Sequence, residues 1–227
     1  MSPYVGIIIT LVAFGIGTYL FKWSKGFFLF TPLFVGMVLG IVILKVTGIS
    51  YDDYNNGGKM ISFFLDPATV AFAIPLYKKR DVLKKYALEI MMSLTIGTAL
   101  AVLMIVVTGK LMNIHEDIIL AILPQAATTA IAIPIAQSIG GIQSITAFAV
   151  IFTAVLIYAL GKNFIKWFNI KNPISRGLAL GASGHALGVS VGLEIGETEA
   201  AMASLSVVVV GLVTVLLVPI FATMMHL

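Results

Sequence analysis

The sequence predicts an all-α integral membrane protein with about seven or eight transmembrane segments, two of them broken by proline. Of its 227 residues, 59% are hydrophobic and only 11% are charged, and its mean hydropathy is +1.07. A soluble domain of this size has no need of so much apolar surface, whereas about eight membrane segments of ~20 residues use nearly all of it. We expect a single polytopic membrane domain over residues 1–227, with N-terminal spans in 1–59 and a core in 60–227.

Two stretches of the chain repeat one another. Leu65–Leu76 is LDPATVAFAIPL and Pro124–Ile135 is PQAATTAIAIPI; aligned from Ala68 and from Ala127, six of eight positions are identical. Each copy follows a proline, which interrupts a helix because it lacks a backbone N–H. An irregular backbone at membrane depth must be buried in protein or line a wet cavity.

The repeat therefore predicts two broken helices, near 66–67 and near 124–125, and an internal repeat of the fold. Paired broken helices at corresponding places typically mark the central site of a transporter. The structural alternative is a pair of proline-kinked packing helices with alanine-rich faces.

The other apolar runs predict conventional spans. They cover Pro3–Leu20, Gly26–Leu44, Tyr86–Thr108, Ile142–Leu160, Gly177–Gly196 and Met202–Met225. Tyr51–Lys59 is rich in turn formers and predicts a polar loop. In Gly177–Gly196 the glycines recur every three or four residues, which predicts one continuous helix with a face for close packing.

Positive charge predicts the topology, because loops rich in lysine and arginine stay inside. If Ile118–Gly141 re-enters instead of crossing, the basic loops all lie inside and the acidic loop 194–199 lies outside. The N-terminus is then outside and the C-terminus inside. Eight full spans are the alternative. The inside loops of this arrangement are 22–25, 78–85 and 162–176, and the other outside loops are 45–59 and 109–117.

His185, within GASGHALG, is the strongest candidate for a functional side chain. Ionisable groups at membrane depth are functional hypotheses by default, and histidine can donate to an anion or carry a proton. The alternative is a neutral histidine that bridges two helices by hydrogen bonds. Ser183 and Ser190 flank it and offer further donors, although a serine in a membrane helix often bonds its own backbone one turn back.

The residues around the two breaks are the remaining candidates. Thr69, Thr128 and Thr129 follow the breaks closely, where half-helix N-termini attract anions, and polar Gln125 lies at the second break. Asp66 is expected to cap a half-helix that begins at the next residue; binding a coupling cation is its alternative role.

No catalytic chemistry is expected from this sequence. It has no cysteine, and its three histidines are too scattered for a zinc site, so we expect neither a metal nor a cofactor. Walker, dinucleotide-binding and HExxH motifs are absent, as is a Ser-His-Asp order. The basic residues lie in short loops between apolar runs, where they set topology, so no nucleic-acid partner is expected.

Three stretches resemble the LrgB/CidB family of bacterial membrane proteins, which also supplies part of the chloroplast glycolate/glycerate translocator. They are PATVAFAIPLYKK at 67–79, TTAIAIPIAQSIGG at 128–141, and GASGHALG with EIGETEAAMASLSVVVVGLVTVLLVP between Gly181 and Pro219. The resemblance implies a multi-pass protein of the bacterial plasma membrane, historically called antiholin-like or a murein hydrolase export regulator. Such proteins work beside a smaller holin-like membrane partner of the LrgA/CidA type. Related members look like carriers of small carboxylates such as glycolate, glycerate and pyruvate.

This chain departs from the family pattern in three places. Members often carry a lysine at the position of Gln125, a Gly-Thr-Ala-Arg run at Gly188–Val191, and a glycine at Asp66. If the two missing cations neutralise a carboxylate in relatives, this protein binds anions more weakly, uses His185 and helix dipoles instead, or prefers another substrate.

We therefore expect a carrier of small organic acids, with a proton coupled through His185. The two broken segments and the His185 helix are expected to meet near the bilayer midplane. The alternative is an antiholin-like regulator of murein hydrolase export and autolysis that acts with an LrgA/CidA-type partner. An oligomeric pore and a homo-oligomer also stay open.

Overall fold

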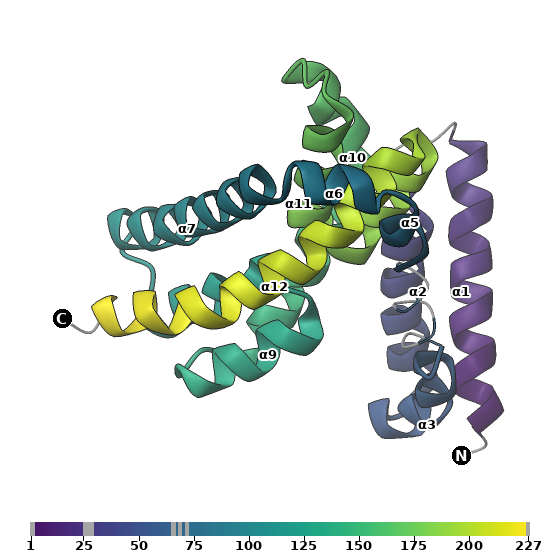
Figure 1. The fold of residues 1–227 in the computed structure, drawn as a ribbon. Helices are drawn as coiled ribbons and strands as arrows, with labels where there is room; N and C mark the ends of the chain where they lie inside the picture. Colours follow the sequence, from purple (N-terminus) through teal and green to yellow (C-terminus); the bar gives the residue numbers. More distant parts are fainter. Residues whose placement is uncertain (1–2, 25–29, 65–66, 68–69, 71–72, 226–227) are drawn as a thin grey trace. The chain divides into compact units, whose positions relative to one another are not determined.

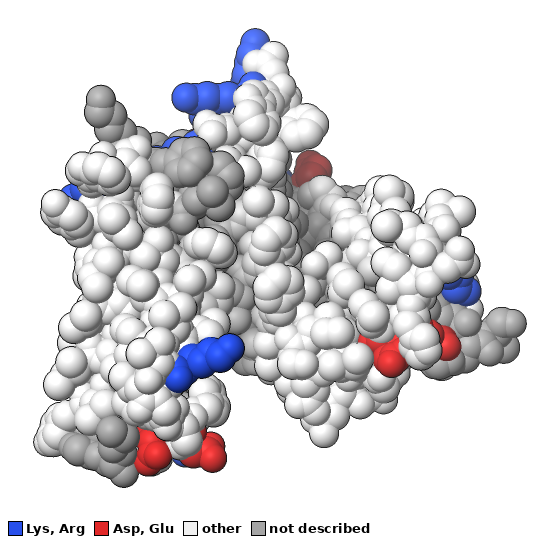
Figure 2. All heavy atoms as spheres, turned by 180° about the vertical axis from the view of Figure 1, so that it is seen from behind, with Lys and Arg blue, Asp and Glu red and all other residues white. Residues whose placement is uncertain are grey.

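The protein is all-α. The computed structural model describes residues 3–24, 30–64, 67, 70 and 73–225, and within these ranges all regular structure is helical. By length and composition, five of the described helices are able to cross a membrane. On the face drawn in Figure 2, charged side chains form a few small groups and most of the surface carries none. The predicted fold class is thereby confirmed. The chain forms two compact units, Met1–Ala71 and Phe72–Leu227.

The first unit holds three helices, α1 (Pro3–Trp23), α2 (Pro32–Thr47) and α3 (Tyr51–Ser62). In Figure 1, α1 and α2 run side by side. Their backbones approach closely, because a Cβ atom added at Gly17 would lie 2.8 Å from the carbonyl oxygen of Pro32. Small residues allow such contact between membrane helices.

The predicted polar loop at 51–59 is wrong, because these residues form most of α3. The Ser50 hydroxyl accepts from the backbone N–H of Asp53 at 3.1 Å and caps the helix. It also donates to the Asp53 carboxylate at 2.8 Å, which lowers the pKa of that carboxyl below its ordinary value. The hydroxyls of Tyr54 and Thr10 lie 2.9 Å apart and join α3 to α1. These contacts outweigh the turn-forming composition of the segment.

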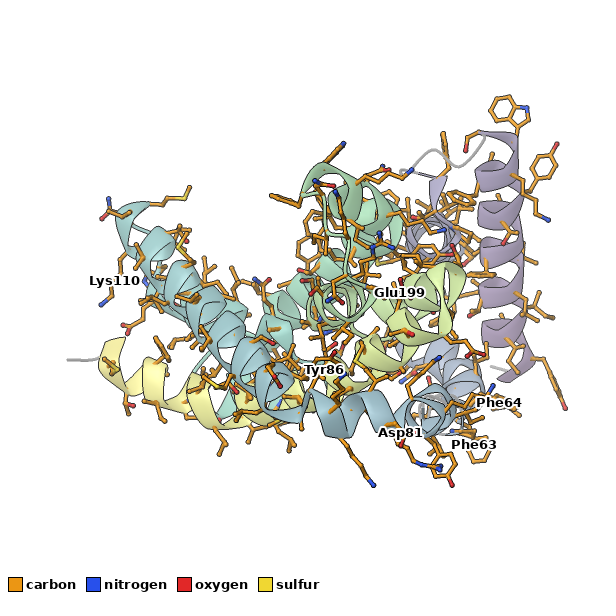
Figure 3. All side chains as sticks on the ribbon, turned by 45° about the horizontal axis from the view of Figure 1, so that its top comes forward. Phe63, Phe64, Asp81, Tyr86, Lys110 and Glu199 are labelled. Atoms are coloured by element: carbon orange, nitrogen blue, oxygen red, sulfur yellow. The ribbon has the colours of Figure 1, made fainter. Side chains whose placement is uncertain are left out.

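The second unit is built on three long helices. Two of them, α7 and α12, lie side by side and run in the same direction (Figure 1). Ile90 shares one core cluster with Met202, and further along both helices Val102 shares another with Val218. Tyr86 and Lys110 lie at the two ends of α7 in Figure 3. The long helices are α7 (Ala87–Leu111), α10 (Gln143–Trp167) and α12 (Glu197–Met225), and the short helices α5 (Ala73–Lys78) and α6 (Arg80–Lys85) precede them.

The predicted second break is confirmed, and it makes a hairpin. Helix α8 (Glu116–Ile122) gives way at Pro124 to one turn of 3₁₀ helix, η2 (Leu123–Ala126), and α9 (Thr129–Ser138) follows. A Cβ atom added at Gly141 would lie 2.7 Å from the backbone nitrogen of Ala121, so the chain after α9 has returned to α8. At ~1.5 Å per residue, neither arm is longer than about half of the ~30 Å hydrocarbon core, so neither arm crosses it. We call residues 116–141 the first hairpin.

The predicted continuous helix at 177–196 is wrong, because α11 (Pro173–Ile195) breaks at His185. This residue has φ 49° and ψ −134°, outside the helical region. A Cβ atom added at Gly188 would clash with the carbonyl oxygen of Leu180, although residues eight apart in a helix are separated by about 12 Å. The two arms therefore fold back against each other. We call residues 173–195 the second hairpin, and its glycines allow the close approach of its arms.

The predicted separation of acidic and basic loops is also wrong. Lys162 Nζ lies 2.6 Å from Glu194 Oε2, and Arg176 Nη1 lies 3.6 Å from Glu199 Oε1. Lys79 Nζ lies 3.6 Å from a carboxylate oxygen of Glu197. All three acidic residues thus lie at the basic end of the unit, because the second hairpin returns to the side from which it starts.

The C-terminal part of α12 lies at the other end of this unit. Val218 and Ala222 belong to one core cluster with Ile119 of α8. Within this unit, the end of α12 therefore lies away from the basic loops, and the side of the membrane that the C-terminus faces stays a prediction.

Candidate functional site

The tips of the two hairpins meet at a small cavity in the second unit. Its volume is about 150 Å³, and α7 and α10 complete its wall. Val102 and Thr153 lie near the middle of those two long helices, which places the cavity midway along them. We call it the tip cavity. Its lining residues are Ala101, Val102, Ile105, Leu123, Gln125, Ala126, Thr153, Ala182 and Ser183.

The polar groups of the tip cavity are neutral. Gln125 comes from the first hairpin, Ser183 from the second, and Thr153 from α10. The Thr153 hydroxyl lies 3.5 Å from Oε1 of Gln125, and it donates to the backbone carbonyl of Ala149 at 2.8 Å. These groups offer hydrogen bonds to a carboxylate or a hydroxyl. None of the described lining residues carries a charge.

His185 joins the two hairpin tips. Its side chain is buried, with 5% of the residue exposed, and the ring lies close to the backbone of Gln125. Among the described residues, its Nε2 atom has no hydrogen-bond partner. Buried polar atoms without partners are rare and destabilising, and they cluster at functional sites. His185 does not line the tip cavity itself, but it follows Ser183 by two residues and contacts the tip that carries Gln125.

Comparison with known proteins decides the family. A family profile described as the LrgB-like family matches residues 10–224. The chain belongs to the LrgB-like family. The resemblance predicted from three motifs is confirmed.

Relatives of this LrgB-like chain match it over nearly its whole length. It is 64% identical over 221 residues to the antiholin-like protein LrgB of Bacillus subtilis strain 168, covering 97% of this chain and 96% of the relative. It is 60% identical over 221 residues to the proteins of the same name from Bacillus cereus strain B4264 and Bacillus anthracis strain CDC 684 / NRRL 3495, with the same coverage. No solved structure matches the chain.

The structure of this LrgB-like chain brings together some of the predicted residues and not others. Gln125, Ser183 and His185 meet at the hairpin tips. Thr128 caps α9 by position, and Thr129 is the first residue of that helix, so both lie at a half-helix N-terminus as predicted. Neither of these threonines lines the tip cavity.

The other predicted residues lie elsewhere in the LrgB-like chain. The Ser190 hydroxyl donates to the backbone carbonyl of Ala186 at 3.2 Å. It thus bonds its own helix one turn back, which was the structural alternative to a role in binding a ligand. Asp66 and Thr69 are outside the described residues. Thr153 was not predicted, because nothing in its apolar segment distinguishes it from a threonine that bonds its own helix. Within the described chain, no group of three or more His, Asp and Glu side chains is placed to hold a metal ion.

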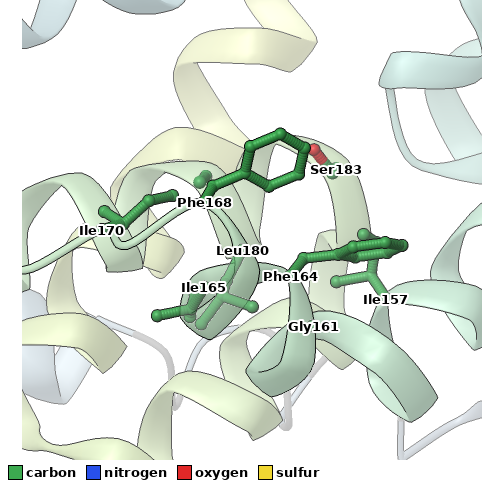
Figure 4. A pocket seen from close by; sticks show the side chains of 9 residues that line it. Ile157, Gly161, Phe164, Ile165, Phe168, Ile170, Leu180 and Ser183 are labelled. Carbon is green, nitrogen blue, oxygen red and sulfur yellow. The ribbon is translucent and has the colours of Figure 1, made fainter.

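A second cavity of the LrgB-like chain begins on the other side of Ser183. It has a volume of about 270 Å³ and lies between α10 and the first arm of α11. Figure 4 shows the rings of Phe164 and Phe168 in its wall, near Ser183. We call it the apolar groove, because apart from Ser183 its lining side chains are apolar. They are Ile157, Gly161, Phe164, Ile165, Phe168, Ile170, Ala179 and Leu180.

Proposed function

We propose that this protein is an antiholin-like regulator of murein hydrolase export and autolysis in the bacterial plasma membrane, acting with a holin-like membrane partner of the LrgA/CidA type. The observation that supports this role is its identity of 60 to 64% to relatives named antiholin-like protein LrgB, over 97% of the chain. A regulator of this kind acts through an interaction surface.

The test of this role is lysis in a strain that lacks the protein. We expect faster autolysis in the deletion strain, and restoration of the wild-type rate by the plasmid-borne chain. His185→Ala is expected to restore it as well, because an interaction surface does not require the tip residue. An unchanged autolysis rate on deletion contradicts the regulatory role.

We propose a second candidate function, the transport of a small organic acid, and the meeting of the two hairpin tips supports it. Helix α10 starts at the base of the first hairpin and ends near the base of the second. At ~1.5 Å per residue its 25 residues span about 37 Å, enough to cross the hydrocarbon core. The hairpins therefore enter from opposite ends of the unit and meet in its middle. Broken helices that meet near the midplane are typical of the substrate sites of transporters.

The chemistry of the tip cavity favours a small solute with at most one negative charge. A volume of about 150 Å³ is below the roughly 300 Å³ at which pockets for drug-sized ligands begin. Gln125, Thr153 and Ser183 supply hydrogen bonds to such a solute. Glycolate, glycerate, pyruvate and lactate have the size and the single carboxylate for such a site, and His185 is the group proposed to couple a proton.

Uptake into proteoliposomes tests the carrier. Radiolabelled glycolate, pyruvate and lactate are offered under an imposed pH gradient to wild type, His185→Ala and Ser190→Ala. We expect saturable, gradient-driven uptake that His185→Ala abolishes. Ser190→Ala is the matched control, since its hydroxyl bonds its own helix and uptake should persist. Flux that does not saturate, or no uptake by folded wild type, contradicts the carrier and leaves the regulatory role.

A further inference from the structure

We propose that α6, the short helix before α7, binds the headgroup phosphates of anionic phospholipids through Arg80, Lys84 and Lys85. The packing of one side of α6, the unpaired charge on its other side and its place beside a membrane-crossing helix support this assignment. Helix α6 contributes no residue to the tip cavity, and the inference depends on neither of the functions proposed above.

Helix α6 is bent away from the helices on either side of it. Lys79 before it has φ −107° and ψ 20°, and Tyr86 after it has φ −114° and ψ 22°, both far from α-helical values. Asp81 and Tyr86 mark this segment in Figure 3. Helix α6 therefore does not continue the axis of α7, which is long and apolar enough to cross a membrane, and it stays at the level where α7 begins.

The apolar side of α6 packs on the second unit. Val82 and Leu83 lie against the core cluster that contains Ile90 of α7 and Met202 of α12, and Tyr86 packs on the same cluster. Because the core holds this side, the opposite side of the helix is presented in a fixed orientation. Groups that are ordered before binding lose less conformational entropy when they bind.

The side of α6 that faces away from the core carries three cations. Arg80 and Lys84 are four residues apart and so lie on one face of the helix, and Lys85 follows them. All three residues are exposed. None of them forms an ion pair with another residue that the structure describes.

Acidic side chains near α6 reduce its positive charge without cancelling it. Asp81 on α6 and Glu89 in the first turn of α7 are both exposed. Glu197 lies 3.8 Å from Lys78 Nζ and 3.6 Å from Lys79 Nζ, so it neutralises the two lysines that precede α6. Together with Glu197, residues 78–89 hold five basic and three acidic side chains, and the unpaired cations remain available to an anion.

Tyrosines beside the cations fit the depth of lipid headgroups. The guanidinium carbon of Arg80 lies 4.7 Å from the ring centroid of Tyr77, and Lys85 Nζ lies 5.2 Å from that of Tyr86. Tyr77 is 70% exposed. Tyrosines at the ends of membrane segments are typical of the headgroup level. Basic residues on an amphipathic helix at this level are attracted to acidic lipids, so the charge of α6 is complementary to an anionic phospholipid surface.

Quenching of a tryptophan beside α6 by brominated lipid measures this binding. The chain has two tryptophans, so Trp23→Phe and Trp167→Phe remove both, and Leu88→Trp places a single fluorophore at a residue that is 71% exposed. This single-tryptophan protein is reconstituted into phosphatidylcholine vesicles with increasing fractions of brominated phosphatidylglycerol or brominated phosphatidylcholine. We expect half-maximal quenching at a roughly tenfold lower mole fraction of phosphatidylglycerol, because several cations near the surface attract an anionic lipid.

Two variants with the same loss of charge locate the effect. Lys84→Gln with Lys85→Gln is expected to reduce the preference for phosphatidylglycerol to less than about threefold, because each lysine near the surface adds to the attraction. Lys166→Gln with Lys171→Gln removes two exposed lysines from residues 162–176 at the same end of the unit and should retain the tenfold preference.

Three outcomes overturn the proposal. An equal fall in the preference in both double variants shows a general effect of charge and no binding at α6. Equal quenching of the single-tryptophan protein by the two lipids shows that α6 does not select anionic lipid, as expected if its partner is an acidic protein segment. Absence of quenching by either lipid shows that protein covers this surface.

Discussion

At His185 the backbone adopts φ 49°, a value that a residue other than glycine rarely takes, and this single residue turns α11 back on itself. Strain of this kind is of order 1–3 kcal/mol and persists only where the surrounding packing imposes it. Here Gly188 lies against the backbone of Leu180, and Gly181 lies against Ala203 of α12. The packing of two glycines therefore holds the histidine at the tip.

The first prediction tests this packing. Gly188→Ala places a methyl group against the backbone carbonyl of Leu180, which cannot move aside as a side chain would. We expect a loss of about 3 kcal/mol in the free energy of unfolding, because overpacking against backbone is not relieved. Gly97→Ala on α7 is the control, since nothing lies within 4 Å of its added Cβ, and it should be neutral or stabilising. Unfolding in mixed micelles measures both, and equal stability of the two variants would contradict the hairpin.

The second prediction separates the two serines near His185. Ser183 lines the tip cavity, whereas Ser190 bonds its own helix. If the cavity binds substrate, Ser183→Ala should raise the KM for acid uptake about five- to tenfold, the loss of one hydrogen bond of about 1 kcal/mol. Ser190→Ala should leave KM unchanged. A KM that shifts equally in both variants would locate the substrate outside the tip cavity.

Of the two hairpins, only the first could be predicted from the residue types in the sequence. Pro124 lacks a donor and forces a break, so the first hairpin follows from the residue type. The second hairpin contains no proline at its tip, and its glycines fit a continuous close-packed helix equally well. The non-helical backbone of His185 and the approach of Gly188 to Leu180, eight residues away, distinguish the two arrangements. Contacts of that kind arise from tertiary packing, which no local pattern encodes.

The third prediction concerns the ion pairs at the base of the second hairpin. The Glu199 side chain is 8% exposed and pairs with Arg176, whereas both partners of the Lys162–Glu194 pair are about half exposed. Arg176→Gln leaves a buried carboxylate without its cation and should destabilise the protein by roughly 3 kcal/mol. Lys162→Gln breaks an exposed, solvent-screened pair and should cost at most about 1 kcal/mol. Chemical unfolding of both variants tests this order, and the reverse order would refute it.

On the scale of the whole molecule, the hairpins decide where the charges lie. The sequence separates the acidic residues from the basic loops by an apolar segment long enough to cross, so charge alone suggested opposite sides. Because that segment turns back, Glu194, Glu197 and Glu199 neutralise basic residues at one end of the second unit. The membrane fold, the family and the first hairpin could thus be predicted from the sequence. The second hairpin, its ion pairs and the contribution of Thr153 required the tertiary structure.

The fourth prediction gives the orientation of the second unit. Its basic end holds residues 78–85 and 162–176, which the positive-inside rule assigns to the cytoplasm. The C-terminal part of α12 lies at the opposite end and should face outward. Since the chain has no cysteine, single cysteines can be introduced at Ser175, Met112 and Thr223.

A membrane-impermeant maleimide reports the orientation in intact cells. We expect labelling of Met112→Cys and Thr223→Cys, and labelling of Ser175→Cys only after the membrane is permeabilised. Labelling of Thr223→Cys and Ser175→Cys under the same condition would contradict this arrangement.

At the hairpin tips, the ring of His185 approaches the main chain of Gln125. Every residue type supplies a backbone group, so position 125 is free to change its side chain while the joint between the tips survives. Its side chain also lines the tip cavity. A substitution at position 125 can therefore replace the neutral amide in the cavity by a cation, while the backbone contact between the two hairpin tips is kept.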